Sequence, residues 1–281
     1  MMPYVLIVSA TVLFSLQFLF NSGYERECGS GWPVALNFAI LNGIFGALFV
    51  FAMGGFRWEF SWFSLLLAVV TAINSLLYTY STIKALAVAN LSLFSMLAML
   101  GGMLLPYVYG LCIGEPFKWT GLLCCLLIAA ALLLTVEKGG SKRGALIHYA
   151  MVFITNGMSG VLASIHQKGS HAISSNGYLL LSRLALLACC LLLLLINRRP
   201  AARPTGKAVV FATGHAVLNT GGNLLMLLAL LHLPATVQYP IVTGGVIVLS
   251  AVIDFLRKER VPRRNWIAVA IAFAASVCMA L

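Results

Sequence analysis

The chain has 281 residues, of which 61% are hydrophobic and only 9% are charged, and its formal net charge is +11 at pH 7. Soluble domains carry about 45–50% apolar and about 25% charged residues, so this composition leaves too little polar surface for a water-soluble protein. It excludes a pair of soluble domains, which the length alone would favour, and predicts an integral membrane protein.

Ten apolar runs, separated by charged or Gly/Pro-rich breaks, follow one another along the chain. A transmembrane helix needs about 20 mainly apolar residues, and in lipid all of its backbone polar groups must be paired internally. We therefore expect an all-α membrane protein with ten transmembrane helices, at 3–22, 33–54, 61–83, 88–111, 118–136, 144–166, 174–196, 207–231, 234–256 and 265–281.

Polar side chains recur inside several of these predicted helices. In the first, Gln17 and Asn21 are four residues apart and so share a face. In the third, a row of Thr71, Ser75 and Thr79 is accompanied by Asn74 and Tyr78. In the eighth, an equally spaced row is formed by three residues: His215, Asn219 and Asn223. Such rows predict either the lining of a polar cavity or hydrogen bonds between helices, and the second alternative contributes only about 0.6 kcal/mol per bond on average.

Arg183 lies about ten residues from either end of the seventh predicted helix. An arginine at that depth costs about 2.5–3.5 kcal/mol on insertion scales, and an intramembrane charge predicts a functional contact or strong structural hydrogen bonding.

The ninth predicted helix contains Pro234 and Pro240. A proline inside a helix frees a carbonyl group and weakens the helix there, so two residues between them, Gln238 and Tyr239, are candidate substrate contacts. His215 is also a candidate for proton coupling, whereas the histidines near helix ends are expected in interfacial packing: His148, His166, His171 and His232.

The basic residues are distributed unevenly between alternate loops. One set of loops holds fourteen of them, and the opposite set holds only Arg57, Lys118 and Lys168. By the positive-inside rule the fourteen-residue side is cytoplasmic and both termini face outward. The net charge therefore sets orientation in the membrane and predicts no nucleic-acid partner.

The two halves of the chain overlay after a shift of 144 residues. The segment "KALAVANLSLFSMLAMLGGMLLPYVYGLCIGE" ends at Glu115, and "LALLHLPATVQYPIVTGGVIVLSAVIDFLRKE" ends at Glu259. Each is followed by a turn and a helix rich in small residues. The glutamate carboxylate lies before the positive N-terminal end of that helix and is expected to stabilise it by about 0.3–1 kcal/mol. Because five helices per half is an odd number, the predicted repeats, 1–137 and 144–281 with a linker at 138–143, have opposite orientations in the bilayer.

The pattern of a glutamate, a short turn and a small-residue-rich helix resembles the EamA-type, ten-span drug/metabolite transporters. The resemblance covers nearly the whole chain and is strongest over 85–136 and 229–281. It departs from the usual form at two positions. Gly121 is the expected glycine, but its counterpart in the second half is Asn265; Pro240 is the expected proline, but its counterpart in the first half is Met96. The resemblance implies two inverted five-helix units with a substrate site between them.

The expected function is that of a secondary transporter in the cell membrane. Related small multidrug-resistance pumps carry an essential glutamate in their first helix, and this chain has no acidic residue between 1 and 24. That absence argues against the export of lipophilic cations and favours a neutral, zwitterionic or anionic metabolite, such as an amino acid or organic anion. The chain is expected to work as a monomer or weak homodimer without a cofactor or metal.

Two other functions are alternatives to transport. A membrane enzyme would need a nucleophile–base pair or a metal cluster, and neither Cys189 and Cys190 nor the scattered histidines have such spacing. The seven cysteines likewise predict no disulfide framework. A non-transporting membrane subunit or a lipid-handling protein of the same fold stays open, because a fold does not determine a function.

Overall fold

The computed structural model is entirely helical over the residues it describes. These are 2–88, 91–114, 143–197, 204–230, 235–258 and 263–280, with seven further residues in the segment 119–130. Their helices are α1 (Met2–Cys28), α2 (Trp32–Met53), α3 (Trp62–Leu86), α4 (Leu91–Cys112), α6 (Arg143–Lys168), α7 (Ser175–Asn197), α8 (Gly206–Leu230), α9 (Ala235–Leu256) and α10 (Arg263–Ala280).

These helices lie at the positions of nine of the ten predicted spans. Six of them, α1–α4, α6 and α7, contain windows long and apolar enough to cross a membrane. Large apolar side chains such as Leu66, Leu195 and Phe255 are exposed on the outer surface, as expected for a protein surrounded by lipid. The predicted span 118–136 falls mostly outside the described residues, and so do Glu115 and Glu259.

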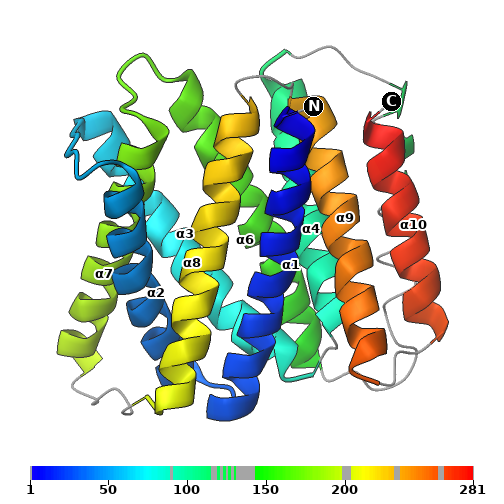
Figure 1. Ribbon diagram of the computed structural model, residues 1–281, viewed down its shortest axis with the longest axis horizontal. Helices are drawn as coiled ribbons and strands as arrows, with labels where there is room; N and C mark the ends of the chain where they lie inside the picture. The colour runs from blue at the N-terminus through cyan, green and yellow to red at the C-terminus, as the bar shows by residue number, and fades with distance from the viewer. Residues whose placement is uncertain are drawn as a thin grey trace.

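Within α1–α4 and within α6–α10 consecutive helices run in opposite directions, and the two chain ends lie at the same end of the bundle (Figure 1). We call that end the upper end; it also carries the α2–α3 turn (54–61) and the α6–α7 turn (169–174). The lower end carries the α1–α2 turn (29–31) and the start of α8. The positions of these turns follow from the alternating directions of the helices.

Short sequence signals fix the helix ends at these turns. Pro33 stands in the first turn of α2, where its missing N–H costs no hydrogen bond. The same helix ends before Gly54 and Gly55, and Gly55 has a φ of +66°, a left-handed conformation that suits glycine. At the start of α7, the Ser174 hydroxyl accepts a hydrogen bond from the backbone N–H of Gly177 at 3.1 Å, as a helix N-cap does.

Neighbouring helices pack in a regular network. Helix α1 packs on α8 and α9, α3 packs on α6 and α7, α2 packs on α7 and α8, and α4 packs on α6 and α9. Small residues bring two of these helices together, because Gly101 of α4 lies against the backbone carbonyl of Phe153 in α6. Such contacts are the usual means by which helices associate in lipid. Helix α4 also contains an internal proline, Pro106.

Candidate functional site

A cavity of about 300 Å³ occupies the centre of the bundle, and all eight of the helices α1–α4 and α6–α9 contribute to its wall. This volume is at the small end of the range of about 300–1,000 Å³ for ligand sites. The wall carries many polar side chains, and these include Gln17, Asn21, Asn42, Thr71, Ser75, Tyr78, Thr79, Thr82, Asn156, Ser159, Ser182, Arg183, His215, Asn219 and Asn223.

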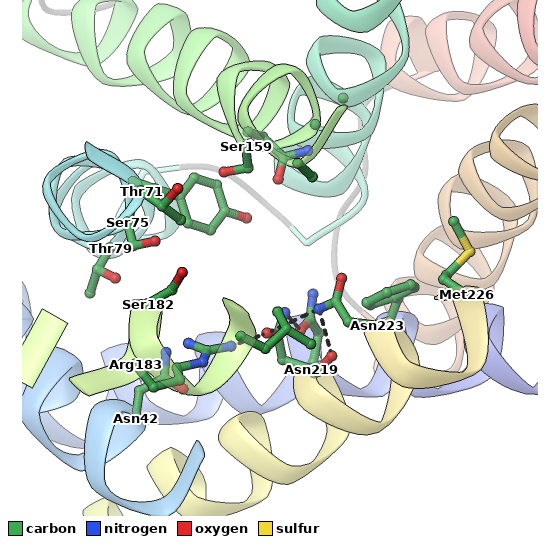
Figure 2. Close-up of a pocket in the computed structure, with 18 of the residues that line it drawn as sticks. Asn42, Thr71, Ser75, Thr79, Ser159, Ser182, Arg183, Asn219, Asn223 and Met226 are labelled. Atoms are coloured by element: carbon green, nitrogen blue, oxygen red, sulfur yellow. Dashed lines mark hydrogen bonds between the residues drawn. The ribbon is translucent and has the colours of Figure 1, made fainter. Parts of the chain in front are cut away.

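Figure 2 shows how these side chains are arranged. Arg183 and Ser182 of α7 lie beside Asn42 of α2 along one wall, and Asn219 and Asn223 of α8 continue the same wall. Ser159 of α6 lies on the opposite side, while the α3 row of Thr71, Ser75 and Thr79 lines the edge between them. The cavity is therefore bounded by a wall with one cation and by a facing wall of hydroxyl and amide groups.

A chain of hydrogen bonds positions Arg183. Its Nη2 donates to Asn219 Oδ1 at 2.6 Å, and Asn219 Nδ2 donates to Gln17 Oε1. Asn223 Nδ2 in turn donates to the backbone carbonyl of Asn219 at 2.7 Å. Because Asn219 uses its amide N–H group on Gln17, its carbonyl oxygen is left to face the guanidinium. The chain thus joins α7, α8 and α1 around the cavity.

His215 lies one turn before Asn219 on the same face of α8 and is buried. Its Nδ1 is 3.5 Å from the backbone carbonyl of Gln17, and its ring lies 5.0 Å from that of Phe38. Phe38 in turn lies 4.6 Å from the ring of Tyr24. Phe38 and His215 line the cavity near its lower end, and we call these three side chains the lower aromatic cluster.

The upper part of the cavity is lined by a second histidine. His166 Nε2 is 2.9 Å from the hydroxyl of Ser64, and its ring stacks on Tyr178 at a centroid distance of 3.9 Å. The Tyr178 hydroxyl is 2.6 Å from that of Thr71. His166 does lie near a helix end, as predicted, but it is buried and joins α6 to α3 and α7 rather than packing at an interface. Next to it, the exposed Gln167 brings the cavity to the upper surface.

The predicted site residues divide into three groups. Six of them line the cavity: Gln17, Tyr78, Arg183, His215, Asn219 and Asn223. Asn74 does not line it, because its Nδ2 donates to the Thr155 carbonyl at 2.8 Å and to the Ser159 hydroxyl at 2.9 Å, which joins α3 to α6. The side chains of Gln238 and Tyr239 lie outside what the structure describes.

Several lining residues escaped prediction from the sequence. Asn42 is an isolated polar residue in apolar surroundings, and nothing in its neighbourhood marks it, whereas Ser182 directly precedes Arg183 and its position was an available signal. Asn156 and Ser159 stand in "TNGMSG" at 155–160, where the density of small and polar residues was an available signal. Within the described ranges, no group of three or more His, Cys, Asp or Glu side chains is placed to hold a metal ion.

No family model and no curated protein matches the chain. Solved structures do resemble it, and one crystal structure superposes with a TM-score of 0.66, covering 98% of this chain and 95% of the other at 15% sequence identity. At that identity the likeness shows a shared fold alone. The resemblance to EamA-type transporters therefore stays a prediction.

Proposed function

We propose that the chain is a secondary transporter of the drug/metabolite type, which moves a small neutral, zwitterionic or anionic metabolite across the cytoplasmic membrane by alternating access. The observation that carries this proposal is the polar central cavity, walled by α1–α4 and α6–α9. Polar groups inside a membrane bundle are costly and typically mark a substrate pathway. In transporters built from repeats, the substrate site lies between the two halves.

The helix contacts support an inverted repeat. If the two halves are equivalent, α1 corresponds to α6, α2 to α7, α3 to α8 and α4 to α9. The contact of α1 with α8 then corresponds to that of α6 with α3, and the contact of α1 with α9 corresponds to that of α6 with α4. The contact of α2 with α8 likewise becomes that of α7 with α3, while the pairs α2–α7 and α4–α9 are unchanged. The main packing network therefore maps onto itself, which two related halves would explain.

The two ends of the cavity differ in a way that suits alternating access. The cavity reaches the exposed Gln167 at the upper end, and the lower aromatic cluster lies toward the other end. In the 144-residue register, the counterparts of Phe38 and His215 are the smaller Ser182 and Thr71, which lie in the upper half. The lower end thus carries aromatic rings at the positions where the upper end carries small hydroxyl side chains.

The charge distribution supports the proposed orientation. Basic residues cluster at or beside helix ends on the lower side, and these are Arg26, Lys84, Arg143, Lys207, Arg257, Lys258, Arg263 and Arg264. Positive charge favours the cytoplasmic side, so we place the lower end in the cytoplasm. In that orientation the cavity of this structure opens to the outside and both termini are external.

Solute exchange in proteoliposomes tests the proposal. Purified protein is first screened for thermal stabilisation by a metabolite library, since a ligand that binds the folded state raises the melting temperature. Hits are then measured for counterflow with wild-type protein and with Asn219→Leu. We expect counterflow that the substitution abolishes while the protein stays monodisperse. If stabilising metabolites are found but none is exchanged, a non-transporting membrane subunit or a lipid-handling protein becomes the better assignment.

A further inference from the structure

Arg183 is a cation in the cavity wall, and no carboxylate belongs to that wall among the described residues. A guanidinium offers five N–H donors, and the structure gives Arg183 one side-chain hydrogen bond, to Asn219. A charge removed from water is costly unless it is paired and hydrogen-bonded. The site therefore holds an uncompensated positive charge with donors to spare.

The surroundings hold this charge in one position. The stem of Arg183 crosses α2 at Gly46, where an added Cβ would lie 3.1 Å from Nε and 3.2 Å from Cδ. On the other side, Asn219 is held by its hydrogen bond to Gln17. Helices α7 and α8 are not one of the closely packed pairs, so the Arg183–Asn219 bond spans the cavity wall rather than reinforcing a packed seam. The guanidinium is thus preorganised to meet a ligand.

We propose that the cavity recognises a small monocarboxylate, whose anionic group binds the guanidinium of Arg183. This proposal rests on the transporter function and narrows it to one substrate class. Arginine–carboxylate pairs are charge-assisted and often bidentate. Arg183 is the one Lys or Arg side chain in the described wall, so a second anionic group on the ligand would find no cation. The cavity volume and the hydroxyl groups on the facing wall suit a short polar body rather than a long alkyl chain.

Matched acid and amide pairs test the charge requirement. Monocarboxylates of three to six carbons, such as lactate, are compared with their primary amides, such as lactamide, by thermal stabilisation of the full-length protein in nanodiscs. We expect the acid of at least one pair to bind about 30-fold more tightly than its amide, which corresponds to about 2 kcal/mol. Succinate, a dianion, is expected to bind more weakly than the preferred monoanion.

Substitutions then assign the preference to Arg183. Arg183→Gln should remove the difference between acid and amide, and Arg183→Lys should keep part of it. Gly46→Ala supplies a subtler change, because the new methyl group must displace the Arg183 stem, and it should weaken the binding of the acid alone. Gly43→Ala is the matched control on the same helix, since its Cβ would meet the Leu187 Cβ at an ordinary 3.4 Å.

The outcomes separate this inference from the transporter proposal. If no acid is preferred over its amide, or if Arg183→Gln leaves the preference unchanged, monocarboxylate recognition is wrong. If the Arg183→Gln protein exchanges the wild-type substrate at the wild-type rate, the inference also fails while transport stands. If Arg183 binds monocarboxylates but no solute exchange is found, the inference holds and the transporter proposal fails.

Discussion

Phe38 of α2 and His215 of α8 lie against each other at the lower boundary of the cavity, with ring centroids 5.0 Å apart and an interplanar angle of 51°. Phe38 is 2% exposed and His215 is 5% exposed. The pair joins a helix of the first half to a helix of the second half. A rocking motion of the two halves about the cavity would have to separate these rings before the lower end opened.

Truncating one of these rings should open the lower end. With Phe38→Ala, a cysteine introduced at Ser75 on the cavity wall should become reactive toward a membrane-impermeant thiol reagent added at the lower face of oriented vesicles. The measurement uses a background in which the seven native cysteines are replaced. Unchanged labelling from the lower face would contradict the assignment of this cluster as the closure.

The matched control lies at the opposite end. Phe63 of α3 stacks on His166 with ring centroids 6.2 Å apart, so Phe63→Ala removes a comparable ring near the upper opening. We expect this variant to leave labelling from the lower face at the low wild-type level. An equal increase with both variants would indicate general loosening of the bundle.

Two asparagines that face different surroundings should behave differently when replaced by leucine. Asn74→Leu removes hydrogen bonds between α3 and α6, and we expect a stability loss of about 0.6–1.7 kcal/mol with counterflow retained. Asn219→Leu removes the acceptor of Arg183 and should abolish counterflow. The comparison needs thermal unfolding and exchange rates for both proteins. Loss of exchange in Asn74→Leu at unchanged stability would place Asn74 in the site after all.

The contact between α4 and α6 should not tolerate an added methyl group. A Cβ on Gly101 would overlap the backbone carbonyl of Phe153, and a backbone atom cannot move aside by changing a rotamer. Gly101→Ala should therefore destabilise the protein by about 1–3 kcal/mol, as overpacking does. Gly206 is the control, because a Cβ there would meet no atom within 4 Å. Equal melting temperatures for the two variants would refute the close approach of α4 to α6.

The start of α7 should depend on a carboxylate from another loop. Glu59 accepts hydrogen bonds from the backbone N–H of Ser174 at 2.7 Å and from its hydroxyl at 2.8 Å. We expect Ser174→Ala to cost about 1 kcal/mol, as the loss of an N-cap does, and Glu59→Gln to cost about 0.3–1 kcal/mol through the helix dipole. Because both act on one contact, a double-mutant cycle should show that the losses are not additive. Additive losses would mean that the two residues act independently.

The sequence predicted the features that depend on local spacing. Apolar run length placed the helices, and the four-residue spacing of His215, Asn219 and Asn223 placed them on one face of α8. Cavity lining was one of the two alternatives that this row predicted, and all three residues line the cavity. Asn74 shows the limit of that reasoning, because it lies beside the row on α3 and its amide is turned to α6. Which helix covers a given face is decided by tertiary packing, which spacing does not encode.

The contacts that organise the site come from residues distant in sequence. Phe38 and His215 are 177 positions apart, and neither carries a local signal for their pairing. The approach of Gly46 to the stem of Arg183 is equally invisible, since a glycine in an apolar helix is common. Arg183 itself was identifiable, because a charge at that depth in lipid is costly wherever it points.

Pro106 removes a backbone hydrogen bond from a residue of the cavity wall. A proline within a helix cannot donate to the carbonyl four residues earlier, which here belongs to Gly102, and Gly102 lines the cavity. The Gly102 oxygen therefore lacks its usual partner within α4 whatever side chains line the wall. Pro106→Ala would restore the missing N–H and pair this oxygen, so a residue outside the wall controls the backbone bonding of a residue within it.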